Sequence, residues 1–182
     1  MPNMILLNDQ VSPEIKASIA GAEEYPEIER LMVETAKWLR SKGSTQWSGL
    51  LSGSDDHDMA GALERQEVVV FKAAEGTLLA CAILQQEAED WDRKLWRLDP
   101  GESGTAIYLH RLTVNRGQSG RSLGKTVMDW IRQEMSFPGK DRIRLDCIGS
   151  NETLNAFYKT CGYTYIGESD GFSLYENRLP VR

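Results

Sequence analysis

The segment 107–125 constrains the fold and function of this chain more than any other stretch. An apolar, strand-forming run at 107–114 passes through a loop rich in glycine and serine into a helix-forming stretch that begins near residue 123. The first backbone N–H groups of a helix have no partner within it, and the helix dipole favours negative charge there. This order of strand, loop and helix predicts a site for a phosphate or pyrophosphate group.

Hydrophobic periodicity predicts a mixed α/β (α+β) fold. Alternating or continuous apolar runs predict strands at 15–20, 68–73, 78–85, 106–114, 142–148, 163–167 and 172–177. Spacings of three and four predict helices at 25–42, 59–65, 123–135 and 151–161. The stretches 47–58 and 87–104 are expected to be loops. Antiparallel hairpins and one β-α-β crossover follow from this order.

Length and charge limit the kinds of partner. A chain of 182 residues fits one domain over residues 1–182. Its net charge of −6 disfavours nucleic acid and anionic membranes as partners. No apolar run is long enough to span a membrane and the first residues lack the features of a signal peptide, so a cytoplasmic location is expected. Cys81, Cys147 and Cys161 are widely spaced among apolar residues, which predicts buried free thiols and no metal site.

The phosphate loop does not match two common nucleotide motifs. Residues 119–126 read Ser-Gly-Arg-Ser-Leu-Gly-Lys-Thr, whereas the P-loop pattern requires glycine at position 119. Gly117 and Gly120 are out of phase with that pattern, and only 56 residues follow Thr126. The dinucleotide fingerprint G-x-G-x-x-G is absent as well.

Two motifs resemble the GNAT superfamily of acetyl-CoA-dependent N-acetyltransferases. The family's strand is followed by Arg/Gln-x-x-Gly-x-Gly/Ala; here Gly120 and Gly124 match, and Ser122 replaces the middle glycine. The cost of that serine depends on whether the position requires a positive φ. A second block, 151–163, is similar to the family's Asn-(six residues)-Tyr-(three residues)-Gly-Phe/Tyr pattern.

The resemblance implies a GNAT fold with acetyl-CoA as cosubstrate. Such a fold has a mixed, mostly antiparallel sheet of about six or seven strands, about four flanking helices, and a splay between the fourth and fifth strands. Pantetheine would pair with the backbone of the 112–114 strand, and the pyrophosphate would lie on 119–125. The cofactor-binding residues implied are Leu112, Thr113, Val114, Ser119, Gly120, Arg121, Ser122, Leu123, Gly124, Lys125 and Asn151.

Two catalytic candidates follow from the chemistry. An amine that attacks a thioester must lose a proton to a base, and the departing thiolate needs a proton. Tyr158 matches the family tyrosine that protonates the thiolate, although its helical spacing also fits a core residue. His110 lies on the strand that would present the thioester, but regular alternation gives it the same face as Leu112 and Val114 unless a bulge intervenes.

The acceptor is not marked by any motif. Glu87 is a second candidate for the base, and the acidic run 54–58 would either attract a cationic amine or cap a helix. The resemblance implies an enzyme that acetylates an amine of a small molecule, amino acid or peptide. A non-catalytic acyl-CoA-binding sensor or partner module on the same fold is the alternative. A homodimer is compatible with either.

Overall fold

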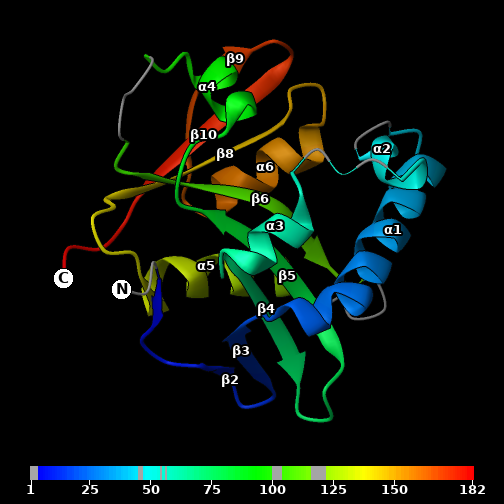
Figure 1. Cartoon of the computed structure of the whole chain (residues 1–182). Helices are drawn as coiled ribbons and strands as arrows, with labels where there is room; N and C mark the ends of the chain where they lie inside the picture. Colours follow the sequence, from blue (N-terminus) through cyan, green and yellow to red (C-terminus); the bar gives the residue numbers. More distant parts are fainter. Residues whose placement is uncertain (1–3, 45–46, 54, 56, 100–103, 116–121) are drawn as a thin grey trace.

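A single large sheet forms the centre of the molecule (Figure 1). A computed structural model describes residues 4–44, 47–53, 55, 57–99, 104–115 and 122–182. Among them, eight strands lie in the order β2-β3-β4-β5-β6-β8-β10-β9. Their bounds are β2 Gln10–Ser12, β3 Ile15–Ile19, β4 Val68–Ala73, β5 Leu78–Gln85, β6 Ala106–Val114, β8 Arg142–Ile148, β9 Thr164–Ser169 and β10 Phe172–Arg178. A small separate ribbon pairs β1 (Ile5–Leu6) with β7 (Met135–Ser136).

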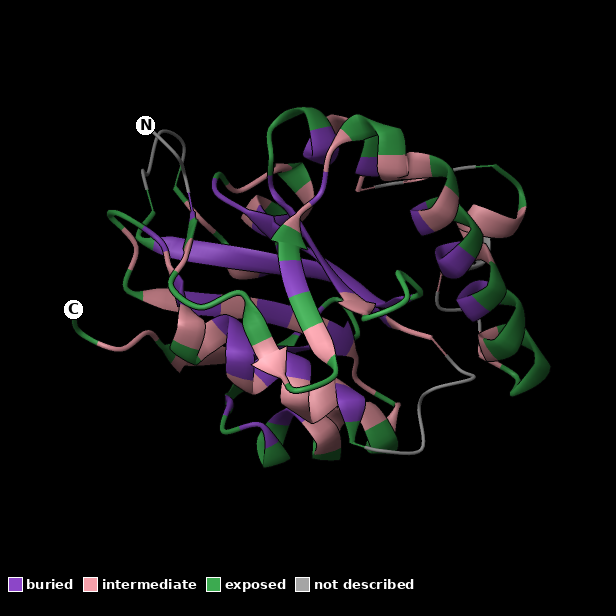
Figure 2. Cartoon of the chain, turned by 90° about the horizontal axis from the view of Figure 1, so that it is seen from below, coloured by how far each residue is buried: buried purple, intermediate pink, exposed green. Residues whose placement is uncertain are grey.

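Helices cover both faces of the sheet. The described helices are a 3₁₀ turn η1 (Ala22–Glu24), α1 (Tyr25–Ser41), α2 (Ser48–Leu51), α3 (Met59–Glu64), α4 (Asp90–Trp96), α5 (Leu123–Glu134) and α6 (Glu152–Thr160). α1 and α3 pack with one set of sheet residues, and α5 and α6 pack with the other. The central strands between these layers are buried, while the helices turn exposed faces outward (Figure 2). No described helix combines the length and apolar character needed to cross a bilayer.

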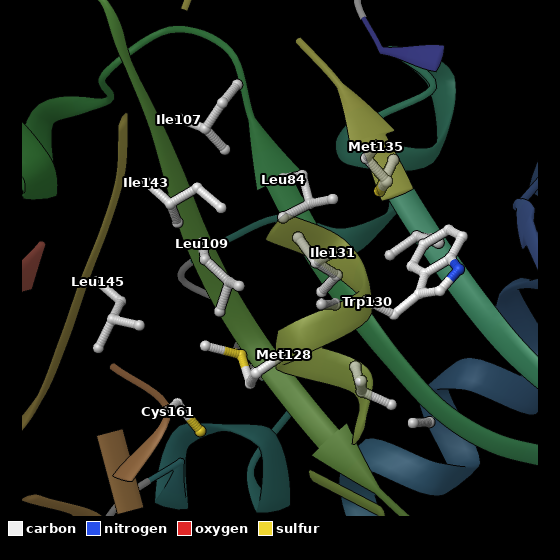
Figure 3. Close-up of a cluster of buried hydrophobic side chains, with 14 of the residues drawn as sticks. Leu84, Ile107, Leu109, Met128, Trp130, Ile131, Met135, Ile143, Leu145 and Cys161 are labelled. Carbon is white, nitrogen blue, oxygen red and sulfur yellow. The ribbon is translucent and has the colours of Figure 1, made fainter. Parts of the chain in front are cut away.

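The larger core cluster lies between α5 and the sheet (Figure 3). Met128 and Ile131 of α5 face Leu109 of β6 and Leu84 of β5. Ile131 is fully buried, and burial of one such side chain is worth about 1.5–3 kcal/mol. This packing fixes the start of α5 relative to the end of β6.

The parallel pairing of β6 with β8 is short. Its register runs from Ala106 opposite Arg142 to Tyr108 opposite Arg144. Beyond these three pairs, β6 continues on β5 and β8 continues on β10. The predicted splay between the fourth and fifth strands is therefore confirmed.

The fold class and most predicted elements are confirmed, with corrections. The sheet has more strands, and the molecule more helices, than the family resemblance implies. The predicted loop 47–58 contains α2, which at four residues is too short to show helical periodicity. The predicted loop 87–104 contains α4, which buries only Asp92 and Leu95 and so has no apolar stripe. The three cysteines are buried and free, as predicted.

Candidate active site

β6 contains one residue more than the part of β5 that it faces. Cys81 pairs with Thr113 and Ile83 pairs with His110, so two β6 residues lie opposite one residue of β5. Arg111 is one of the two, with a φ of 55° in the left-handed region. This is a β-bulge, which reverses the faces of the side chains that follow it.

The bulge separates His110 from Leu112 and Val114. Before it, Ile107 and Leu109 point to the cluster under α5 and α6; after it, Leu112 and Val114 pack against the same cluster. His110 therefore lies on the opposite face, the side of α1 and α3. Regular alternation predicts His110 on the face of Leu112 and Val114 unless a bulge intervenes, and the structure contains that bulge.

The start of α5 has the geometry of an anion site. Ser122 is the N-cap with a φ of 55°, so the position does require a positive φ, at a cost for serine of roughly 1–2 kcal/mol. The first helical bond forms from the Thr126 N–H to the Ser122 carbonyl, at 3.0 Å. The N–H groups of Leu123, Gly124 and Lys125 therefore have no acceptor within the helix. Ser119, Gly120 and Arg121 lie outside the described residues.

Gly124 marks the point where β6, α5 and α6 meet. A Cβ at this position would lie 3.1 Å from Cζ of Phe157 on α6 and 3.9 Å from Cγ2 of Val114. Absence of a side chain thus lets the two helices approach closely. Lys125 directs its Nζ to Asp129 Oδ2 at 2.7 Å, and its ammonium is half-exposed in this pair.

The second motif block forms the start and inner face of α6. Asn151 caps the helix, since its Oδ1 accepts the Leu154 N–H at 3.0 Å. Tyr158 is buried, and its ring lies 5.9 Å from that of Tyr175 and 6.4 Å from that of Tyr163. Burial strongly raises the pKa of the Tyr158 hydroxyl, which therefore keeps its proton.

His110 belongs to a buried hydrogen-bonded pair. Its Nε2 lies 2.9 Å from Oδ1 of Asp92, a carboxylate on α4 with no exposed surface. Oδ2 of Asp92 also accepts a bond from Gln85 Nε2 at 2.8 Å and one from the Glu89 backbone N–H at 3.1 Å. These bonds hold the carboxylate and fix the plane of the imidazole ring.

A second histidine stacks on the first. The rings of His57 and His110 lie 4.0 Å apart at an angle of 18°. His57 Nδ1 lies 2.6 Å from Glu89 Oε1, which is also 3.9 Å from His110 Nε2. Glu89 thus lies at the edge of the stacked pair, near a nitrogen of each ring.

Carboxylates determine the electrostatics of the cluster. Burial lowers the pKa of His110, but the hydrogen bond and charge of Asp92, with the charges of Asp146 and Glu89, outweigh it and raise the pKa above its ordinary value. Asp146 on β8 is half-buried, its desolvation raises its pKa, and it accepts a hydrogen bond from the Trp91 indole at 3.3 Å. His110 is consequently an imidazole of increased basicity.

The acidic run 54–58 has divided roles. Asp55 Oδ2 accepts the Met59 N–H at 2.8 Å and Asp58 accepts the Gly61 N–H at 3.1 Å, so both cap α3 as one interpretation predicts. Asp55 also pairs with Arg111 at 3.4 Å. Ser54 and Asp56 lie outside the described residues.

Arg111 connects the bulge to this loop. Its guanidinium lies 5.1 Å from the centre of the Trp47 ring, and its side chain is buried. Stacking and the pair with Asp55 hold the residue in its left-handed conformation.

Sequence reasoning placed His110 at the site but missed several of its neighbours. Neither Glu89 nor Asp92 is marked by a motif, and His57 entered only as part of the acidic run 54–58. Glu87, the alternative base, is exposed, and it is Glu89 that contacts the histidines. The sequence signal for this part of the site was the high content of charged residues and tryptophan in 87–104.

The same cluster includes groups of metal-ligand type. His57, Glu89 and His110 form one described group, and Asp92, His110 and Asp146 form another. An imidazole binds a metal through a lone pair in its ring plane. Because the two rings are nearly parallel, their lone pairs do not converge on one point. This geometric argument applies to the first group, which contains both rings.

Comparisons with known proteins agree with this architecture. The Acetyltransferase (GNAT) family model matches residues 32–163. The chain is 42% identical over 173 residues to the uncharacterized N-acetyltransferase YesJ of Bacillus subtilis (strain 168), with 94% of each protein covered. A GNAT-family acetyltransferase structure from Listeria monocytogenes has a TM-score of 0.75 and 37% identity, covering 91% of this chain and 95% of that one.

A more distant structure extends the likeness of the fold. A PaiA N-acetyltransferase from Thermoplasma acidophilum, in complex with coenzyme A, has a TM-score of 0.64 at 16% identity, covering 90% of this chain and 98% of that one. The family match spans most of the chain and both sequence motifs. The chain therefore belongs to the GNAT family of acetyltransferases.

Proposed function

We propose that residues 1–182 act as one domain that transfers an acetyl group from acetyl-CoA to an amine of a small molecule, amino acid or peptide. Direct attack takes place with both substrates bound. The observation that carries this proposal is the bulge at Arg111, which gives the two faces of β6 different functions. Backbone and α5 serve acetyl-CoA on one side, and His110 serves the amine on the other.

The acetyl-CoA side uses mainly backbone groups. Where the β6–β8 ladder ends, the main chain of Leu112, Thr113 and Val114 pairs with pantetheine. The amides of Leu123, Gly124 and Lys125, which have no acceptor within α5, receive the pyrophosphate. The close approach at Gly124 brings this end of α5 next to Val114. The coenzyme A held by the Thermoplasma protein supports the same ligand here.

His110 accepts the proton of the attacking nitrogen. An alkyl ammonium has a pKa of about 10, so the neutral amine needs a base to form and react at neutral pH. Both polar contacts of the His110 ring involve Nε2, which leaves Nδ1 for the acceptor. The raised pKa of His110 suits this task because it reduces the difference between the pKa of the base and that of the amine.

The bonds balance without a covalent enzyme intermediate. The C–N bond forms as the C–S bond breaks, His110 gains a proton from nitrogen, and the departing CoA thiolate takes its proton from water. Burial raises the pKa of Cys81 and Cys147 to about 12 and of Cys161 to about 11, so none is a thiolate near pH 7. None of these cysteines therefore provides the thiolate that a covalent acyl-cysteine intermediate requires.

The oxyanion and the leaving thiolate are stabilised by hydrogen bonds. The backbone N–H of Leu112, at the bulge, donates a hydrogen bond to the oxyanion of the tetrahedral intermediate. The hydroxyl group of Tyr158 donates a hydrogen bond to the sulfur. Because burial raises its pKa, a hydrogen bond is favoured over complete transfer of its proton to a thiolate whose conjugate acid has a pKa of about 8.5–9. Asn151 supports this region by capping α6.

Release of free CoA tests the function directly. The protein is incubated with acetyl-CoA and separate panels of polyamines, amino acids, aminoglycosides and peptides, and thiol is measured. We expect thiol release that depends on one acceptor class, and thermal stabilisation by CoA but not by Mg·ATP. Stabilisation by CoA without turnover of any amine would favour the sensor alternative, and stabilisation by ATP alone would contradict the assignment.

Tyr158→Phe should reduce kcat by about 10- to 100-fold, because a hydrogen bond to a charged group is worth roughly 1.5–3 kcal/mol. The Kd for CoA should change little, since the ring packing remains. Steady-state kinetics and calorimetric CoA binding check both parts. Tyr165→Phe, at an exposed position on β9, is the matched control. Equal activity of the two variants would remove Tyr158 from the mechanism.

Asp92→Asn should shift the pH dependence of kcat/KM. The base acts when deprotonated, so the rate of the native protein should rise with pH through a pKa above 6.5. Loss of the Asp92 charge removes the main influence that raises this pKa. The rising limb should therefore move to lower pH, and activity at high pH should fall because the ring is less basic. A limb that stays in place would show that His110 is not the titrating group.

A further inference from the structure

The proposed function requires a path for a proton out of a buried base. An amine that arrives as an ammonium ion leaves as a neutral amide, so each turnover releases one proton. His110 receives that proton, but only 5% of its side chain is exposed. Its closest polar partner, Asp92, has no exposed surface and cannot pass the proton to water.

Glu89 and His57 lie on the way to solvent. The side chain of Glu89 is 30% exposed and that of His57 is 15% exposed, so exposure rises away from His110. Glu89 Oε1 is 2.6 Å from His57 Nδ1 and 3.9 Å from His110 Nε2. The shorter contact is a hydrogen bond, and one water or a small side-chain rotation closes the longer one.

We propose that Glu89 and His57 form a relay that carries the catalytic proton from His110 to solvent. This inference rests on the proposed acetyl transfer. Nε2 of protonated His110 gives its proton to Glu89, and the carboxyl group passes it to His57 Nδ1. His57 then loses a proton to water or buffer. The amine proton stays on Nδ1 of His110, and the cycle closes when Nδ1 loses this proton to water and Nε2 takes one back. Only O–H and N–H bonds form and break, and no oxidation or reduction takes place.

The charges around His110 favour this direction. Asp92 and Glu89 face it from the start of α4, Asp146 faces it from β8, and His57 stacks on it from the segment before α3. Arg111 follows it in β6 but pairs with Asp55. Two imidazolium rings 4.0 Å apart repel each other, so protonation of one favours the neutral form of the other. Glu89 lies within 4 Å of a ring nitrogen of each histidine and so connects the two positions between which a proton can move.

Asp92 and Glu89 therefore differ in role. Asp92 orients His110 and makes it more basic, so its loss changes the pH dependence at every buffer concentration. Glu89 transfers the proton, so its loss limits the rate only where no other carrier is present. A small diffusible base is able to replace a lost relay group, whereas it does not repair a lost structural contact.

The test compares kcat of Glu89→Gln and His57→Gln at low and high concentrations of imidazole buffer. We expect kcat of each variant to be about 10-fold or more below the native value in dilute buffer. It should recover with added imidazole, with an unchanged KM for acetyl-CoA. The native protein should be insensitive to buffer concentration. Asp90→Asn, which removes an exposed charge next to Glu89, is the matched control and should behave like the native protein.

The outcomes separate the relay from the proposed function. Unchanged kcat in both variants, or a loss that imidazole does not restore while circular dichroism shows a folded protein, would overturn the relay. An active native protein with an impaired His110→Gln variant would leave the proposed function standing in that case. Full activity of His110→Gln would remove His110 as the base and overturn the relay with it. Absence of amine-dependent thiol release from the native protein would instead contradict the function itself.

Discussion

The extra residue in β6 determines how the rest of the site is arranged. A regular strand would place His110, Leu112 and Val114 on one face and bury the histidine under α5 and α6. The bulge at Arg111 turns His110 to the other face while Leu112 and Val114 remain against the core. A non-glycine residue in the left-handed region costs of order 1–3 kcal/mol. The contacts of Arg111 with Asp55 and Trp47 offset part of that cost.

The two halves of the site come from different kinds of sequence. In the proposed function, the acetyl-CoA half would use backbone at the end of β6 and the start of α5, so its side chains would be free to vary, as Ser122 illustrates. The acceptor half would use side chains from α4, from the segment before α3 and from β8. Buried carboxylates such as Asp92 are stable only when hydrogen-bonded, and the capping link at the start of α4 supplies part of that bonding. α4 therefore supplies the carboxylate that raises the pKa of His110.

Periodicity and motifs predicted the parts of this chain that repeat a regular pattern. The amphipathic face of α5 and the buried run of β5 were readable because packing against a sheet imposes those spacings. The end of α6 at Gly162, with a φ of 88°, follows from local chemistry in the same way, whereas Asn151, expected within the helix, is its N-cap. The bulge at Arg111 was not readable, because arginine is not a residue that favours positive φ. α4 was not predicted, because its short length and its polar buried face produce no apolar stripe.

The partners of His110 were hidden for a related reason. Glu89 and His57 are 32 residues apart in sequence, and only the fold brings them within 2.6 Å. Sequence alone gave no reason to prefer Glu89 over Glu87. The backbone path between the end of β5 and the start of α4 determines that Glu89, and not Glu87, points toward the histidines.

A crystal structure of the protein with acetyl-CoA, or with a stable thioether analogue, tests the central claim most directly. The account predicts pantetheine hydrogen-bonded to the main chain of Leu112 and Val114 where β6 parts from β8. The pyrophosphate should lie at the first amides of α5, and the acetyl group should reach across the bulge toward His110. Pantetheine bound elsewhere, or an acetyl group on the side of β6 away from His110, would contradict it.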